Sequence, residues 1–107
     1  MIRGDLVTIA LQGTYGKPRP ALVIQSDLFD THPSVTILPI TSDLRDAPLF
    51  RVLLQPNKTN GLQKLSEVMV DKAQTVSREK IGETFGHIST VDMLAVSRSL
   101  AIFLGVL

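Results

Sequence analysis

The sequence contains no cysteine, and its two histidines, His32 and His87, lie far apart in the chain. Without cysteine the protein forms no disulfide bond and offers no thiolate to a metal, and this composition is typical of a reducing compartment. The two histidines have no partners at ligand spacing, so we expect no metal site. The sequence also lacks a glycine-rich phosphate loop and a recognisable Ser/His/Asp arrangement, so it shows no motif for a nucleotide cofactor or for nucleophilic catalysis by serine.

Strong charge of one sign and long apolar runs are also missing. The formal net charge is +1, which neither requires nor excludes a nucleic-acid partner, so any such role must depend on a local cationic patch. No uncharged run is long enough to span a membrane, and the first residues show no apolar signal segment. We therefore expect a cytoplasmic protein with no membrane partner.

The chain of 107 residues predicts a single domain covering residues 1–107. Turn signals separate several short apolar runs with strand character, and one longer helical pattern closes the sequence. The expected strands cover residues 6–10, 20–25, 34–41, 50–54, 66–76 and 82–88, and the expected helix covers residues 90–104. This pattern favours a mainly β fold with a C-terminal helix, arranged as a small, partly open antiparallel barrel.

Four details sharpen this expectation. The uninterrupted apolar run 21–24 indicates a strand that is buried on both faces. Pro39 cannot donate a hydrogen bond, so it argues for an edge strand or a bulge. Residues 66–76 are read as one long strand. Ser89 is a suitable N-cap for the final helix, whose nearly continuous apolar surface favours packing against both the sheet and a partner subunit.

The segment Lys17-Pro18-Arg19-Pro20 holds two cations in a stiff stretch of backbone. Each cation precedes a proline, which disfavours helical geometry and keeps the residue extended. An arginine held in this way at the start of a buried strand could bind a phosphate group with two parallel hydrogen bonds. The alternative is a turn that enters an edge strand, with a solvated arginine.

Other polar residues lie at the ends or interruptions of apolar strands. Thr41 and Ser42 follow one strand, while Asp71 and Lys72 interrupt the 66–76 run. Polar groups at neighbouring strand ends of a small barrel can converge on one groove, where a hydroxyl group could bind a phosphate oxygen. The alternatives are an ordinary strand-to-loop transition and a solvated ion pair.

Taken together and in order, these segments resemble the MazF/PemK (Kid) family, the toxins of type II toxin–antitoxin modules. No single segment is specific, but six of them occur in the family's order along nearly the whole chain. The similar segments are Arg3–Val7, Arg19–Ile24, Leu38–Ser42, Phe50–Leu54, Asn60–Leu62 and Val70–Val76.

The resemblance implies a homodimeric SH3-like barrel and a metal-independent endoribonuclease that cleaves single-stranded RNA at a short sequence. In this family the 2′-hydroxyl attacks the adjacent phosphorus and leaves a 2′,3′-cyclic phosphate and a 5′-hydroxyl end. It also implies a cognate antitoxin of the MazE/PemI kind, whose disordered tail fills the RNA groove.

By match to the family motifs, Arg19 would be the catalytic arginine and Thr41 the catalytic threonine that binds the scissile phosphate. The expected RNA-binding residues are Lys17, Ser42, Phe50, Asp71 and Lys72. Some members carry an arginine two residues before the acidic position, where this chain has Met69, so either Arg19 or Lys72 would have to supply the acid. The loop 12–17 is shorter than in many members.

Two other classes of protein share features with this chain. A gyrase poison of the CcdB kind has a similar barrel and depends on C-terminal residues, which here are Gly105-Val106-Leu107. Such a poison does not need the Arg19-Pro20 and Thr41-Ser42 pairs. A non-catalytic SH3-like binding module is the other alternative, in which Arg19 would be structural.

Overall fold

The structure is a computed structural model that describes residues 1–10 and 17–106. Within these residues, seven strands form one sheet, accompanied by three short 3-10 helices and one α-helix. The elements are β1 Asp5–Ile9, β2 Arg19–Val23, η1 Asp27–Phe29, β3 Ser34–Thr41, β4 Arg51–Leu54, β5 Ser66–Met69, η2 Val70–Lys72, β6 Gln74–Ser77, η3 Arg78–Lys80, β7 Ile81–His87 and α1 Thr90–Leu104.

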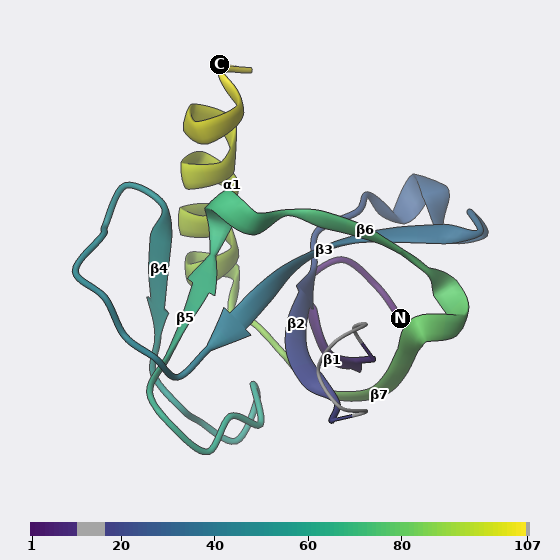
Figure 1. Cartoon of the computed structure of the whole chain (residues 1–107), viewed down its shortest axis with the longest axis horizontal. Helices are drawn as coiled ribbons and strands as arrows, with labels where there is room; N and C mark the ends of the chain where they lie inside the picture. The colour runs from purple at the N-terminus through teal and green to yellow at the C-terminus, as the bar shows by residue number, and fades with distance from the viewer. Residues whose placement is uncertain (11–16, 107) are drawn as a thin grey trace.

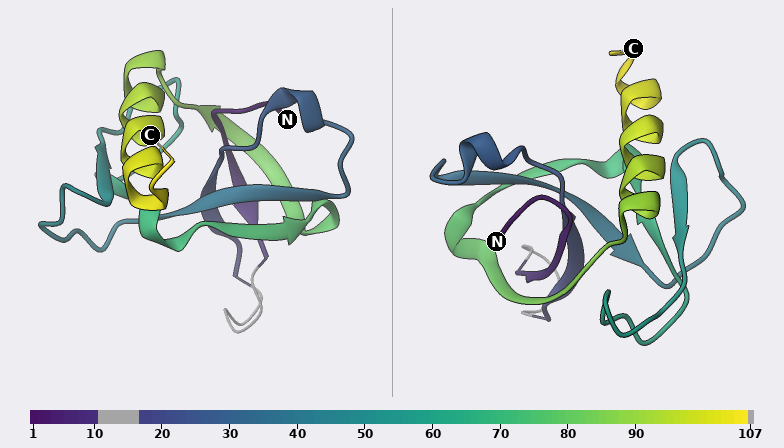
Figure 2. Two further views of the ribbon diagram at one scale, coloured as in Figure 1. Left: turned by 90° about the horizontal axis from the view of Figure 1, so that it is seen from above. Right: turned by 180° about the vertical axis from the view of Figure 1, so that it is seen from behind.

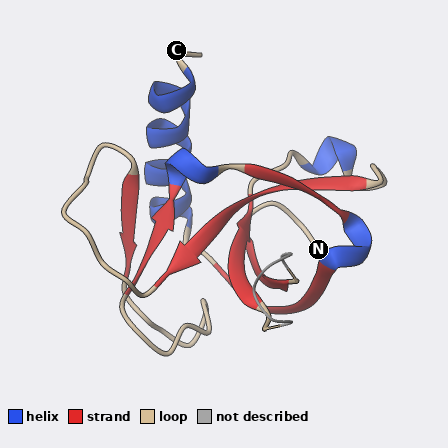
Figure 3. Ribbon diagram, viewed as in Figure 1, coloured by secondary structure: helices blue, strands red, loops and turns tan. Residues whose placement is uncertain are grey.

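The strands follow the order β4-β5-β3-β2-β1-β7, with β6 paired to β3 beside this path. Each of these pairings is antiparallel. The sheet curls strongly, so that β1, β2, β3, β6 and β7 surround one core while β4 and β5 extend to the side, where α1 packs (Figures 1 and 3). The predicted mainly β, SH3-like, partly open barrel with a C-terminal helix is confirmed.

The central strands are apolar on both faces because they separate two hydrophobic cores. Leu6, Leu22 and Leu38 belong to the core that packs under α1, together with Val96 of that helix. The residues that alternate with them belong to the core inside the curled sheet, namely Val7, Ile9, Ala21, Val23, Val35 and Ile37. Alternation along each strand therefore supplies both cores, and the predicted burial of the run that begins at Ala21 on both faces is confirmed.

The prediction of one long strand over residues 66–76 is wrong. The chain breaks into β5 and β6, separated by the single turn η2. β5 pairs with β3 in the register Ile40↔Val68, which if continued would place Gln74 opposite Ser34. Gln74 instead lies opposite Ile37, so η2 takes up a shift of three residues. The periodicity continues through the segment, but only the pairing with β3 determines where the strand is interrupted.

The sequence predicts either an edge strand or a bulge at Pro39. The residue lies in the central strand β3, so the edge-strand alternative is wrong. On one side β3 pairs with β2. On the other side β6 covers residues 34–37 and β5 covers residues 40–41. Ile24 N donates to Thr36 O, and alternation therefore turns Pro39 toward the second side, between the two partner strands. The missing N–H of Pro39 costs nothing there because the position has no ladder partner.

Helix α1 begins and ends with the expected capping groups. The Ser89 hydroxyl accepts a hydrogen bond from the backbone N–H of Asp92 at 3.1 Å, and Gly105 closes the helix in the left-handed conformation at φ 69°. Val96 is fully buried, whereas Ile102 is 61% exposed, and the second half of the helix projects beyond the sheet (Figures 1 and 2). Among the described residues, no helix has the length and apolar character needed to cross a membrane.

Candidate active site

A groove opens where β3 changes its partner from β6 to β5, next to the start of β2. Its volume is about 280 Å³. The described residues that line it come from β2, β3, β5, η2 and β6, and they are Arg19, Pro39, Ile40, Thr41, Met69, Lys72 and Gln74. The groove therefore exists because η2 bends the chain away from β3, and its position depends on tertiary pairing.

Arg19 enters this groove from the first position of β2, where its Cα lies opposite that of Ile9. Its side chain is exposed, and the flanking Pro18 and Pro20 restrict its backbone. No hydrogen bond or ion pair joins the Arg19 guanidinium to another described residue. The guanidinium is thus available to an anion that enters the groove.

Thr41 ends β3, the strand next to β2, and also lines the groove. Its Oγ1 accepts a hydrogen bond from the backbone N–H of Asp43 at 3.0 Å. This contact uses an acceptor of the hydroxyl group and leaves its O–H able to donate, as a phosphate oxygen requires. The next residue, Ser42, is exposed and lies outside the described lining of the groove.

Lys72 is the second cation of the groove, and it is paired with its neighbour. Its Nζ lies 3.6 Å from Oδ2 of Asp71. Asp71 itself is outside the described lining, and its Oδ1 is buried without a hydrogen-bond partner among the described residues. Two cations and no described carboxylate therefore face the groove, which favours a phosphate-bearing ligand.

Two other predicted RNA-binding residues lie outside the described lining. Phe50 is half-buried, and its carbonyl accepts a hydrogen bond from the N–H of Val70 at 3.0 Å. Lys17 is exposed just before β2. The preceding loop, which the sequence predicts to be short, is almost entirely outside the described residues.

The sequence did not single out Gln74 as part of the groove, and it marked Met69 only as the residue that replaces an arginine of some family members. Gln74 places a neutral amide beside the cations, and Met69 contributes an apolar wall. Both residues lie in the 66–76 segment, which the sequence predicts as one continuous strand. Nothing in such a strand would bring these two side chains to the same groove. The interruption at η2 brings the two residues to the same opening, and apolar periodicity carries no signal of it.

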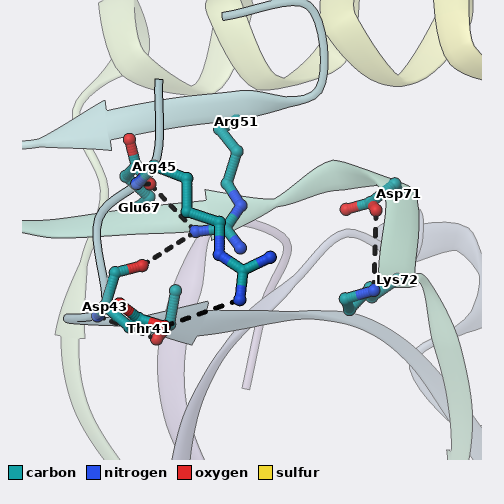
Figure 4. A network of polar contacts seen from close by, with 7 residues as sticks. All are labelled: Thr41, Asp43, Arg45, Arg51, Glu67, Asp71 and Lys72. Carbon is teal, nitrogen blue, oxygen red and sulfur yellow. Dashed lines mark hydrogen bonds and ion pairs between the residues drawn. The ribbon is translucent and has the colours of Figure 1, made fainter. Parts of the chain in front are cut away.

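A buried ion pair contacts the loop that follows Thr41. Arg51 Nη1 is 2.9 Å from Glu67 Oε1, and both side chains are about nine-tenths buried, at 7% and 10% relative exposure. Arg51 also donates to the carbonyl of Asp43 at 3.0 Å, and Glu67 accepts from the backbone N–H of Arg45 at 2.9 Å (Figure 4). This network joins β4 and β5 to the loop that follows Thr41.

Metal chemistry has no visible ligand set in the part of the chain that the structure describes, because no group of three or more His, Cys, Asp or Glu residues gathers there. The groove instead combines an unpaired guanidinium, an ammonium group and a hydroxyl donor. These features define a small β-barrel protein whose groove suits phosphate groups.

Comparison with known proteins identifies the family. Residues 2–104 match the family described as "PemK-like, MazF-like toxin of type II toxin-antitoxin system". The chain belongs to this family, and the resemblance inferred from its sequence is confirmed.

Individual relatives agree with this assignment. The "Probable endoribonuclease MazF" of Mycolicibacterium smegmatis is 44% identical over 107 residues, which cover 99% of this chain and 98% of that protein. "Endoribonuclease MazF9" of Mycobacterium tuberculosis is 24% identical over 114 residues, which cover 97% of this chain and 96% of that protein. A solved mycobacterial "Endoribonuclease in complex with its cognate antitoxin" has a TM-score of 0.85 at 21% identity and covers 100% of this chain and 97% of its own, so it shows that the fold is shared.

Proposed function

We propose that this protein is an endoribonuclease toxin that cleaves single-stranded RNA at a short sequence and thereby inhibits translation and growth. Membership of the toxin family, together with a relative named as an endoribonuclease at 44% identity, carries this proposal. Residues 1–107 would act as one toxin domain. The same relative argues against a gyrase poison or a non-catalytic module.

The proposed reaction is attack of a ribose 2′-oxygen on the adjacent phosphorus. The P–O5′ bond breaks as the P–O2′ bond forms, which leaves a cyclic phosphate. The 2′-hydroxyl loses its proton and the leaving 5′-oxygen gains one. The chemistry needs no metal if side chains stabilise the charge that develops on the phosphate oxygens.

Arg19 and Thr41 are the proposed catalytic residues. The Arg19 guanidinium has no described partner, so it can place two N–H groups against the non-bridging oxygens of the phosphate. Thr41 can donate its hydroxyl proton to the same phosphate because its Oγ1 already accepts from the chain. Met69 offers no proton, and the acid is therefore assigned to Arg19 or Lys72.

The remaining predicted residues are proposed to bind RNA. Lys72 would contact the phosphate backbone, with Asp71 holding its ammonium group in place. Lys17 and Ser42 would extend the contact along the strand on either side of the groove. Phe50 would support a base just before the start of β4.

We also propose that two copies assemble through α1. The helix exposes a stripe of large apolar side chains that a single chain leaves in water, namely Val91, Leu94 and Ile102. Two copies would also combine their cations in one RNA site.

A cognate antitoxin would neutralise the toxin, as the structural relative solved with its cognate antitoxin suggests. The cysteine-free composition is consistent with action in the cytoplasm.

The deciding experiment incubates the purified, antitoxin-free protein with a mixed pool of single-stranded RNA in EDTA. Sequencing the new 5′ ends would identify the cleavage motif, and the 3′ ends should carry cyclic phosphate. Thr41→Ala should lose cleavage while keeping the oligomeric state. An intact RNA pool after exposure to the wild-type protein would refute the proposal. Trapping of gyrase on DNA, with loss of the effect after removal of Val106 and Leu107, would support the poison instead.

A further inference from the structure

We propose that the buried Arg51–Glu67 pair is a positioning device that fixes the loop following Thr41 and so sets the direction of the Thr41 hydroxyl. The inference rests on the proposed ribonuclease function and assigns these two residues a role in it. Neither side chain reaches the described lining of the groove. Their effect on the reaction must therefore pass through the loop.

The pair holds the loop at two points. Arg51 Nη1 donates to the carbonyl of Asp43 at 3.0 Å, and Glu67 Oε1 accepts from the N–H of Arg45 at 2.9 Å. The same two atoms form the ion pair at 2.9 Å. One charged contact thus fixes the backbone on both sides of residue 44 (Figure 4).

The link to the reacting group is direct. The N–H of Asp43, whose carbonyl Arg51 holds, donates to Oγ1 of Thr41 at 3.0 Å. This hydrogen bond sets the side-chain rotamer of Thr41 and the direction in which its O–H can point. Glu67 also lies opposite Thr41 in the β3–β5 ladder, and Arg51 lies opposite Met69 of the groove wall in the β4–β5 ladder.

Because the pair is buried, a role beyond stability can be tested by replacing both residues together. Replacing both members of a buried ion pair by apolar side chains of similar volume often leaves the stability of a protein unchanged or increased. Asp43 and Arg45 are exposed, so water can satisfy the backbone groups that such a replacement frees. The double variant Arg51→Met/Glu67→Leu should therefore fold, but with a loop that is no longer fixed.

The test measures single-turnover and steady-state cleavage of an RNA fragment that contains the motif found with the mixed pool. In the double variant we expect kcat to fall about 10- to 100-fold, because a displacement of about 1 Å can cost about 100-fold in rate. KM should stay within about threefold, and the melting temperature should stay close to that of the wild type. The single variant Glu67→Gln keeps the acceptor oxygen, so its kcat should stay within about threefold of the wild-type value.

Hydrogen exchange at single amides distinguishes a local loosening of the loop from a general loss of stability. The amide of Asp43 should exchange faster in the double variant, while the amide of Leu22 in the centre of the sheet should not change. Asn60→Ala is the matched control, because Asn60 is a buried polar residue that ties the 55–62 turn away from the groove. It should lower stability without lowering kcat.

Three outcomes would overturn the inference. Unchanged kcat in a folded double variant is the first, and an equal loss of kcat in the Asn60→Ala control is the second. If the double variant fails to fold, Arg51→Lys replaces it, because lysine keeps the charge but is shorter and lacks the planar fork. The third outcome is that Arg51→Lys has the wild-type kcat and the wild-type rate of hydrogen exchange at the Asp43 amide. An inactive wild-type protein would instead refute the proposed function.

Discussion

Arg19→Ala separates a catalytic arginine from a structural one. Arg19 is exposed and makes no hydrogen bond or ion pair to another described residue, so its truncation leaves no buried group unsatisfied. Surface substitutions of this kind change stability by less than about 0.5 kcal/mol. Loss of one preorganised donor to a developing oxyanion costs about 100- to 1,000-fold in rate, or about 3–4 kcal/mol of transition-state stabilisation. The structure therefore predicts a large loss of activity in a protein of normal stability.

The assay compares single-turnover RNA cleavage with thermal unfolding and with the oligomeric state. Lys80→Ala is a matched control, because Lys80 is an exposed cation in η3, outside the described lining of the groove. It should cleave at the wild-type rate. Arg19→Lys should recover part of the activity, since it restores the charge but not the planar fork. Cleavage by Arg19→Ala within threefold of the wild type would refute the proposed site. If Arg19→Ala and Lys80→Ala instead lost activity by the same factor, Arg19 would contribute only general electrostatics.

Four further changes test separate parts of the structure. Pro18→Ala should reduce cleavage more than it reduces the melting temperature, because it loosens the backbone before the proposed catalytic arginine; the opposite result would make the proline structural. Gly86→Ala should lower the free energy of unfolding measured in urea by about 1–3 kcal/mol, since an added Cβ would clash with the backbone carbonyl of Asn60. Ser89→Ala should cost about 1 kcal/mol in the same assay through loss of the helix cap. Ile102→Asp should yield monomers in sedimentation experiments, and an unchanged dimer would exclude this face of α1 as the interface.

Local sequence determines most of the elements. The strand β3 and the helix α1 occupy the predicted ranges, because alternation, turn residues and the Ser89 cap are all local signals. The stiffness around Arg19 is equally local, since it comes from two adjacent prolines. The order of the family-like segments was also readable without any structure, and it pointed to the toxin family.

Tertiary structure determines where the groove opens and which charged residues are buried next to the loop after Thr41. Gln74 and Met69 meet at the groove only because β3 changes partners and η2 absorbs the resulting shift. Periodicity cannot reveal that break, since apolar spacing is the same in one strand as in two consecutive ones. Nothing in the local sequence marks Arg51 and Glu67 as buried charges. They are buried because two strands and the loop after Thr41 close around them, and long-range packing of this kind leaves no local pattern.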